Sequence, residues 1–441
     1  MDGRVGLVTL SLPGERLDLC QAPQRALDEA LREAGFAVSV APEIALSRES
    51  LASILKGLTD GGVDAICYLL GTWVDPAVVV SEIRGCRLPA LLVSNPAPAS
   101  FGFTAASAVH GGLDRLGVAH EIFHGEIGGT VWQKRAVPYL RAAVVKKAVA
   151  QSTLGLIGGQ SPGQSSGNLD LSEVQSIFGL STVQIDQLVI VDEAHRVAED
   201  AVAARREWLE TAFGPIHAPE ESVHRSLALM LALEALLRSA GLTFASVKCL
   251  ADAINVCGSF CLPVSLLNSA RQTVSCQGDI PAIILMECLR LLSSEPAFFG
   301  DLVTLDPATG RGRLINCGAS PVALASEPAA VSWHRQYDYM GAGGGVTARF
   351  AIKEGPATLA SMSRSVEGLE MLIAPVQVEA CPSASFSEIR DTWPQGLVRF
   401  LGDAEEVVRD LRSNHVVLGY GDQVAPLLAL ANMWETGVTV V

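Results

Sequence analysis

The sequence lacks the features that mark membrane, secreted and nucleic-acid-binding proteins. No stretch approaches the roughly 18 uninterrupted apolar residues of a membrane helix. The opening, Met1–Val8, has an acid at position 2 and only a short apolar run, so we expect no secretory signal. Basic residues are in the minority, with 32 Lys and Arg against 47 Asp and Glu. The net charge of -15 would repel a phosphate backbone, so we expect neither a nucleic-acid nor a membrane partner.

The ten cysteines lack the spacing of a zinc ribbon. The nearest pair, Cys257 and Cys261, has no second pair at a matching distance. Scattered thiols are typical of buried, reduced cysteines, because disulfides form mainly in oxidising compartments. We therefore expect a cytoplasmic protein.

What the sequence does contain is apolar residues, at 49% of 441, enough to bury the cores of two or three domains. Strand and helix signals alternate over the first 150 residues, which predicts a parallel sheet covered by helices on both faces. The strand signals are at 5–10, 36–41, 65–70 and 90–93, and the helix signals at 25–34 and 51–58.

Two loops of this first segment, 71–76 and 94–96, follow predicted strands. Open α/β sheets bind ligands at that edge. The loops carry Trp73 and Asn95, whose ring and amide are suited to stacking on and hydrogen bonding to a ligand. We expect both residues to bind substrate; the alternative is that Trp73 packs within its own domain.

A second α/β segment begins near residue 150. A helix over 134–150 leads into a strand over 153–157 and a glycine-rich loop over 158–167. The loop lacks the spaced glycines of a dinucleotide site and the Lys-Ser/Thr of a P-loop, so it indicates a turn beside a ligand cleft. A helix over 222–239 precedes a strand over 244–249 that contains Lys248 near its end, as a cleft residue or an exposed strand-end lysine.

Beyond Asp301 the pattern changes to short apolar or alternating segments broken by Gly and Pro, which indicates an antiparallel barrel or sandwich. The predicted fold class is α/β, with two Rossmann-like parallel α/β domains followed by a mostly antiparallel β domain. The predicted domains are 1–150, 151–301 and 302–441.

Gln277 and Asp301 lie 24 residues apart and flank one predicted helix, for which Asp279 is a candidate N-cap. The chain after the helix is long enough to return as a parallel strand. We therefore expect Gln277 and Asp301 at the carboxyl ends of neighbouring strands, with His415 closing the site from the β domain. The alternative roles are a turn for Asp301 and a hydrogen-bonded structural residue for His415.

These three positions and their contexts resemble the metal site of the sugar isomerase family that includes L-fucose isomerase and L-arabinose isomerase. The glycine loop at 158–163 and the turn at 343–350 are similar to that family as well. In the family a Glu, an Asp and a His bind a divalent metal, usually Mn2+. The resemblance implies Gln277, Asp301 and His415 as metal ligands, Asn414 as a substrate-binding residue, a small sugar-like substrate, and a homo-oligomer, either hexamer or trimer.

This sequence departs from the family at Gln277, where the family has a glutamate that also acts as acid and base. An amide can ligate a metal but cannot shuttle a proton, so another group such as Asp301, Asp279 or Lys248 would have to take that role. The lost charge forfeits attraction of about 4 kcal/mol at ~4 Å and an effective dielectric of ~20, so Mn2+ binding would be weakened or lost. Three interpretations stay open: a metal-dependent isomerase with altered acid/base chemistry, an enzyme for another reaction on a polyol-like substrate without metal, and a non-catalytic carbohydrate-binding protein.

Overall fold

The computed structural model describes residues 3–250, 252–337 and 344–441. Its helices and its parallel and mixed sheets confirm that the chain is a mixed α/β protein. The chain forms two compact units. The first contains Met1–Ala148 and Ala425–Glu435, and the second contains Val149–Val424 and Thr436–Val441. Of the predicted glycine turn at 343–350, Gly343 lies outside the described residues. No described helix is long and apolar enough to cross a membrane.

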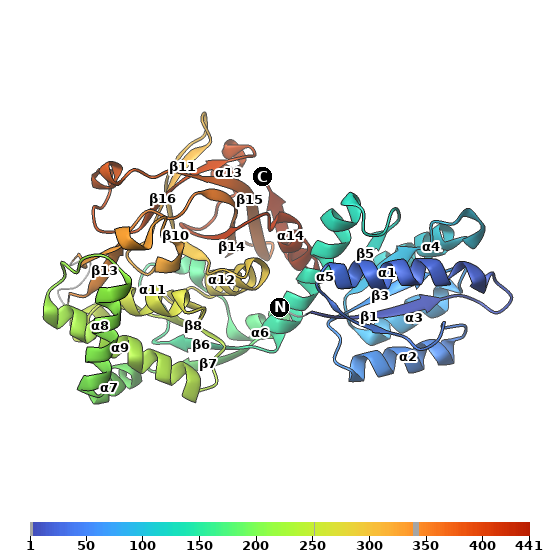
Figure 1. Ribbon diagram of the computed structural model, residues 1–441, viewed down its shortest axis with the longest axis horizontal. Coiled ribbons are helices and arrows are strands. Elements are labelled where there is room, and N and C mark those ends of the chain that lie inside the picture. The colour runs from blue at the N-terminus through green and yellow to red at the C-terminus, as the bar shows by residue number, and fades with distance from the viewer. Residues whose placement is uncertain (1–2, 251, 338–343) are drawn as a thin grey trace. The chain divides into compact units, whose positions relative to one another are not determined.

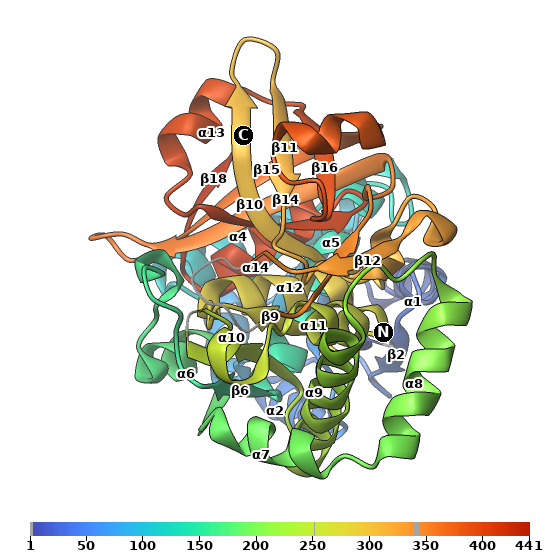
Figure 2. The ribbon, with the colours of Figure 1, turned by 90° about the vertical axis from the view of Figure 1, so that its left-hand side faces the viewer.

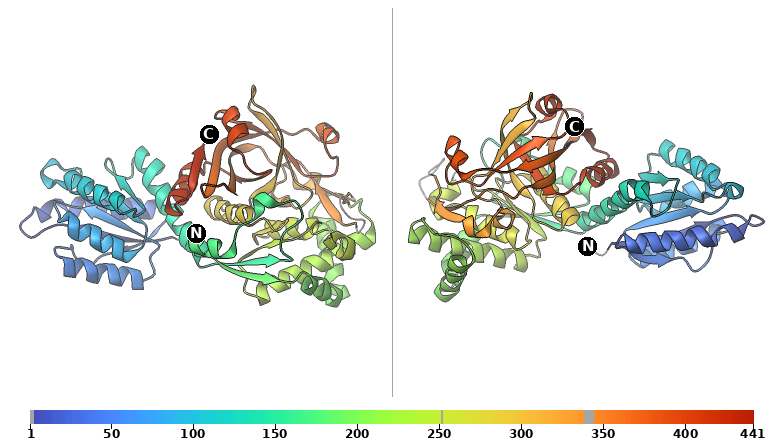
Figure 3. Two further views of the ribbon diagram at one scale, coloured as in Figure 1. Left: turned by 180° about the vertical axis from the view of Figure 1, so that it is seen from behind. Right: turned by 45° about the horizontal axis from the view of Figure 1, so that its top comes forward.

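The first unit is a parallel sheet in the order β2-β1-β3-β4-β5, with helices on both faces (Figures 1 and 3). This order is one of the two common doubly wound arrangements. The strands are β1 (Arg4–Leu10), β2 (Ala37–Val40), β3 (Ala65–Leu70), β4 (Ala90–Ser94) and β5 (His120–Phe123). The helices are α1 (Gln21–Glu33), α2 (Arg48–Asp60), α3 (Pro76–Cys86), α4 (Gly102–Arg115), α5 (Thr130–Ala150) and α14 (Val424–Met433).

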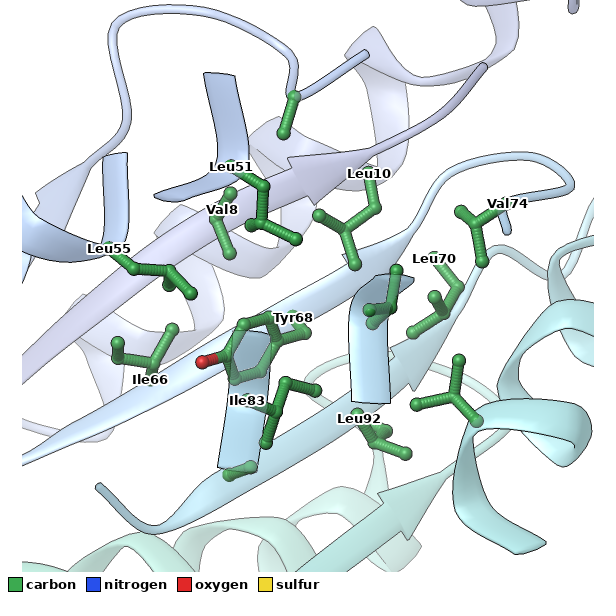
Figure 4. Close-up of a cluster of buried hydrophobic side chains, with 14 of the residues drawn as sticks. Val8, Leu10, Leu51, Leu55, Ile66, Tyr68, Leu70, Val74, Ile83 and Leu92 are labelled. Carbon is green, nitrogen blue, oxygen red and sulfur yellow. The ribbon is translucent and has the colours of Figure 1, made fainter. Parts of the chain in front are cut away.

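The predicted apolar runs become the central strands of this sheet. Every residue of β3 and β4 is buried, because helices cover both faces. On one face, apolar side chains from α2 and α3 pack onto Tyr68, Leu70 and Leu92 (Figure 4). Helix α3 begins where its sequence indicates, since Asp75 caps it and Pro76 occupies its first turn.

The second unit contains a parallel sheet in the order β7-β6-β8-β9. Its strands are β6 (Thr153–Ile157), β7 (Ser181–Ile185), β8 (Phe244–Val247) and β9 (Val274–Cys276). The helices that accompany them are α6 (Leu171–Phe178), α7 (Leu188–Arg196), α8 (Glu199–Ala212), α9 (Glu220–Ser239), α10 (Asp252–Cys257), α11 (Cys261–Ser269) and α12 (Ile280–Ser293).

The same unit contains a largely antiparallel sheet in the order β14-β17-β10-β11-β16-β15-β18 (Figure 2). Pairing of β14 with β15 closes it into a barrel, and β18 adds to β15 in parallel. Its strands are β10 (Phe298–Asp306), β11 (Arg311–Ile315), β14 (Gly355–Arg364), β15 (Leu369–Glu379), β16 (Gln395–Phe400), β17 (His415–Tyr420) and β18 (Gly437–Val440). A separate hairpin, β12 (Ser332–Arg335) with β13 (Val346–Arg349), and helix α13 (Ala404–Asp410) complete the unit.

Helix α12 joins the two sheets of the second unit. It packs on β8 and β9 of the parallel sheet and on β14 and β17 of the barrel. Residues 280–289 are all buried, as expected of a helix that is apolar on every side. The N-terminus of α12 therefore lies where the two sheets meet.

The expectation that Asp301 would stand on a parallel strand beside that of Gln277 is wrong. Gln277 follows β9, at the edge of the parallel sheet, whereas Asp301 belongs to β10 of the barrel and pairs antiparallel with His415. The short β9 offers three residues for pairing, while the nine residues of β10 form long ladders with β11 and β17.

Leu92 tests the core of the first unit. Leu92→Ala leaves a cavity under α3 and α4, so we expect a loss of about 2–5 kcal/mol in the free energy of unfolding. Val131→Ala, at an exposed position of α5, is the control and should change stability by less than about 0.5 kcal/mol. Urea denaturation measures both, and equal losses would contradict the packing.

Candidate functional site

Asp279 connects helix α12 to the barrel. Its Oδ1 accepts a hydrogen bond from the backbone N–H of Ala282 at 2.8 Å, which caps the helix as predicted. Its Oδ2 lies 2.8 Å from Nδ1 of His415, the first residue of β17. Gly167 lies against this carboxylate, where a Cβ would come within 2.9 Å of Oδ2. One buried carboxylate thus serves both the helix and the histidine.

Contacts fix the backbone and the ring of His415 but leave one ring nitrogen without a partner in the described part of the chain. Ser413 Oγ accepts a hydrogen bond from its backbone N–H, and the ring meets Phe299 edge-on at 4.7 Å between centroids. Its Nε2 is buried, has no hydrogen-bond partner in the described part of the chain, and lies 3.9 Å from Asp301 Oδ1. A buried nitrogen aimed at a carboxylate across this gap is suited to bind a third group between them.

Gln277 presents a second buried atom without a partner. Its side-chain Oε1 makes no hydrogen bond to any described residue, and the residue is 8% exposed. The backbone has φ 70°, a left-handed conformation that costs energy for a residue with a side chain. Its carbonyl accepts from Ser161 N–H at 2.9 Å. Strain combined with an unsatisfied polar atom points to a functional position.

Asp301 is the accessible carboxylate of this cluster. Its side chain is 35% exposed, unlike that of Asp279. Asn414 Nδ2 donates to its Oδ1 at 2.7 Å, which leaves Oδ2 available. Burial raises the pKa of Asp301 above its ordinary value, although the charge of His415 opposes the shift.

The charges around His415 favour its protonated form. Burial opposes a charge on the ring, but the hydrogen bond and charge of Asp279, with the charge of Asp301, outweigh it and raise the pKa of His415. A metal at Nε2 would have to displace this proton.

Cys317, which no sequence pattern singled out, follows β11 and lies near His415 and Asp301. Hydrogen bonds with the thiols of Cys261 and Cys276 lower its pKa well below the ordinary value. Cysteines scattered along the chain gave no signal of this grouping.

A pocket of about 550 Å³ opens at the carboxyl edge of the parallel sheet. Its lining includes the turn after β6, the segment after β7, and Lys248 after β8. Gly159 lines the pocket, and a Cβ on Gly278 would overlap its carbonyl oxygen. The turn that carries Gly159 and Ser161 therefore borders both the pocket and Gln277.

Two of the three residues predicted to bind substrate, Trp73 and Asn95, belong to the first unit. Trp73 packs against the core cluster of that unit. Asn95 is buried, and its Nδ2 donates to the carbonyls of Leu19 and Gly71 at 3.0 and 2.8 Å. Its Oδ1 accepts from Ala97 N–H. Both residues thus have structural contacts within their unit, and contact with substrate stays a prediction.

The donor types of Gln277, Asp301 and His415 are ones that a divalent metal accepts. Gln277 Oε1 and His415 Nε2 are buried and unpartnered among described residues, and Asp301 supplies a carboxylate beside the nitrogen. Asp279 on the opposite ring nitrogen is the carboxylate partner that metal-bound histidines commonly have. Oxygen and imidazole donors suit Mn2+.

Replacing Asp279 tests its double role. In Asp279→Ala the cap is lost, at about 1 kcal/mol, and His415 Nδ1 loses its buried partner, at about 1–3 kcal/mol, so stability should fall by about 2–4 kcal/mol. Asp170→Ala is the matched control, because Asp170 caps α6 at the surface through Ser172 N–H. It should cost about 1 kcal/mol. Equal losses in urea denaturation would show that Asp279 is only a cap.

The chain is similar to relatives from several organisms that share one name. It is 23% identical over 345 residues to "Sulfoquinovose isomerase" of Priestia megaterium, covering 76% of each chain. The same name and identity apply to the relative from Alkalicoccus urumqiensis, with 75% of this chain and 76% of that one covered. The relative from Clostridium sp., also named sulfoquinovose isomerase, is 25% identical over 67% of this chain and 66% of its own.

No family model matches the chain. Among solved structures, a periplasmic solute-binding protein from Actinobacillus succinogenes with bound D-allose overlays 67% of this chain and 93% of its own at 12% identity. The TM-score of 0.19 is too low to indicate a shared fold. The similarity that bears on function is therefore the sequence similarity to sugar isomerases.

Proposed function

We propose that the protein is an isomerase that interconverts the aldose and ketose forms of a sugar derivative. The main support is the geometry at the N-terminus of α12, where His415 bonds Asp279 and its Nε2 lies 3.9 Å from Asp301 Oδ1. Gln277, two residues before Asp279 in the chain, has a buried Oε1 without a partner among the described residues. Similarity to sulfoquinovose isomerases over three quarters of the chain supports the same reaction class.

The proposed substrate is a sugar that bears an anionic substituent, as the sulfonated sugar named for the relatives does. The pocket of about 550 Å³ can hold a monosaccharide. Lys248 lines it and would supply a positive charge at short range, despite the net charge of -15. This gives Lys248 a binding role in place of the predicted catalytic one.

We propose that Gln277, Asp301 and His415 hold a divalent ion, with Mn2+ as the natural candidate. When bound, the ion polarises the carbonyl and neighbouring hydroxyl of the sugar. Gln277 contributes a neutral oxygen, so the set has one carboxylate and binds more weakly than a set with two.

Asp301 is the proposed base. Gln277 cannot exchange a proton, and both oxygens of Asp279 are already bonded to Ala282 and His415. Asp301 retains an open oxygen with which it can accept a proton. Asp301 would remove the proton from one carbon and return it to the next, while Asn414 fixes the carboxylate.

A second candidate is isomerisation without metal. The Asp279–His415 pair can hold a proton on Nε2, facing Asp301, as an acid opposite a base. The two candidates differ in their response to chelation. Isomerase activity that survives removal of all divalent ions would select the second.

Gln277→Glu tests the metal site. The new carboxylate adds a charge beside Asp301 and His415, so Mn2+ affinity measured by calorimetry should rise about tenfold or more. Gln175→Glu makes the same charge change on the exposed side of α6 and should leave affinity unchanged. No gain in Gln277→Glu would remove the metal proposal.

Asp301→Asn tests the base. Turnover of a sugar derivative that the unaltered chain isomerises should fall by about 10²–10⁴-fold, because the amide cannot accept the proton. Asp306→Asn, an exposed turn residue later on the same strand, is the control. Unimpaired proton exchange between substrate and solvent in Asp301→Asn would exclude Asp301 as the base.

A further inference from the structure

The first unit contains a cluster of metal-binding side chains that the proposed isomerase site does not use. His110 and Asp114 lie one turn apart on α4, and His120 begins the adjacent edge strand β5 (Figure 1). One ligand atom from each lies within 4.8 Å of the others. His110 Nδ1 is 2.7 Å from His120 Nε2, Asp114 Oδ2 lies 3.4 Å from His110 Nε2, and Asp114 Oδ1 lies 3.9 Å from His120 Nε2.

The contacts of His120 define which ring nitrogen faces the cluster. Its Nδ1 lies 2.7 Å from the carbonyl oxygen of Val118. A carbonyl only accepts, so Nδ1 carries the hydrogen, and Nε2 of the neutral ring presents a lone pair to His110 and Asp114. This is the arrangement that orients metal-bound histidines, in which the outer nitrogen donates to a carbonyl. The His120 side chain is 3% exposed, so its ring is held in place.

A hydrogen bond between the two histidines accounts for only part of this geometry. It satisfies His110 Nδ1 and His120 Nε2. The Asp114 carboxylate approaches His110 from its other nitrogen, at 3.4 Å, and also lies 3.9 Å from His120 Nε2, beyond hydrogen-bond distance. Ligands of a tetrahedral ion with bonds of ~2.0–2.1 Å lie roughly 3.3 Å apart. The side chains of His110 and Asp114 are 40% and 61% exposed, so both can turn to bring His110 Nδ1 and a carboxylate oxygen to that spacing.

The donor types select the class of ion. Two imidazole nitrogens and one carboxylate oxygen suit Zn2+ and neighbouring transition metals, whereas Mg2+ and Ca2+ prefer oxygen ligands throughout. Three protein ligands leave the fourth position to water. We propose that His110, Asp114 and His120 form a Zn2+ site that ties α4 to the edge strand β5 and stabilises the first unit.

The test is a Zn2+ titration of the metal-free full chain against a chromophoric chelator. His110→Gln and His120→Gln should each weaken binding at least tenfold, and Asp114→Asn should weaken it less. His124→Gln is the matched control, since His124 lies on the same unit, where its Nδ1 bonds Ser94 Oγ at 2.6 Å. It should bind as the unaltered chain does. Each titration and melt is repeated in the His415→Gln background, where the proposed ligand of the second unit is absent, so that Zn2+ bound there is not counted.

Thermal melting supplies a second readout. Zn2+ should raise the melting temperature of the unaltered chain and not that of His110→Gln, while Mg2+ at the same concentration should raise neither. His110 is half exposed, so its variant should melt like the unaltered chain without metal. Unchanged Zn2+ affinity in both histidine variants, or sulfur ligands in the X-ray absorption spectrum of the one-to-one complex, would overturn the proposal.

Discussion

The carboxylate of Asp279 is the contact on which the geometry of the second unit depends. It satisfies the N-terminus of α12, which packs between the parallel sheet and the barrel, and it binds His415 where β17 begins. The β10–β17 ladder then places Asp301 opposite His415. The helix cap, the orientation of the ring and the strand register therefore reinforce one another, because each depends on the same buried atoms.

Only a carboxylate with an unbonded oxygen can act on a ligand at this site. Asp279 is buried and fully engaged, and Gln277 is neutral, so Asp301 is the remaining acidic group of the cluster with an open oxygen. Gln277 has a left-handed backbone conformation. Its carbonyl bond to Ser161 and the close packing of Gly278 on Gly159 explain how the surrounding turn holds that conformation.

The proposed catalytic residues all belong to the second unit. The parallel sheet and barrel of the second unit supply the cluster and the neighbouring pocket, whereas Trp73 and Asn95 of the first unit are engaged in their own core and loops. Helix α14 belongs to the first unit although it follows β17 of the barrel in the chain. Local sequence patterns could not reveal that the chain returns to the first unit at α14, since α14 has the same apolar pattern as any buried helix.

The sequence by itself determined the local elements. Long apolar runs became β3 and β6 with the expected bounds, and the Asp-x-Pro pattern at Asp279 became the start of α12, because burial and capping act over a few residues. Tertiary structure decided the pairing. Asp301 joined an antiparallel ladder with His415 instead of a parallel neighbour of β9, and Cys317 came to lie near both residues. The ladder of Asp301 with His415 joins segments more than a hundred residues apart. The choice between ladders depends on pairing between distant segments, which no local pattern encodes.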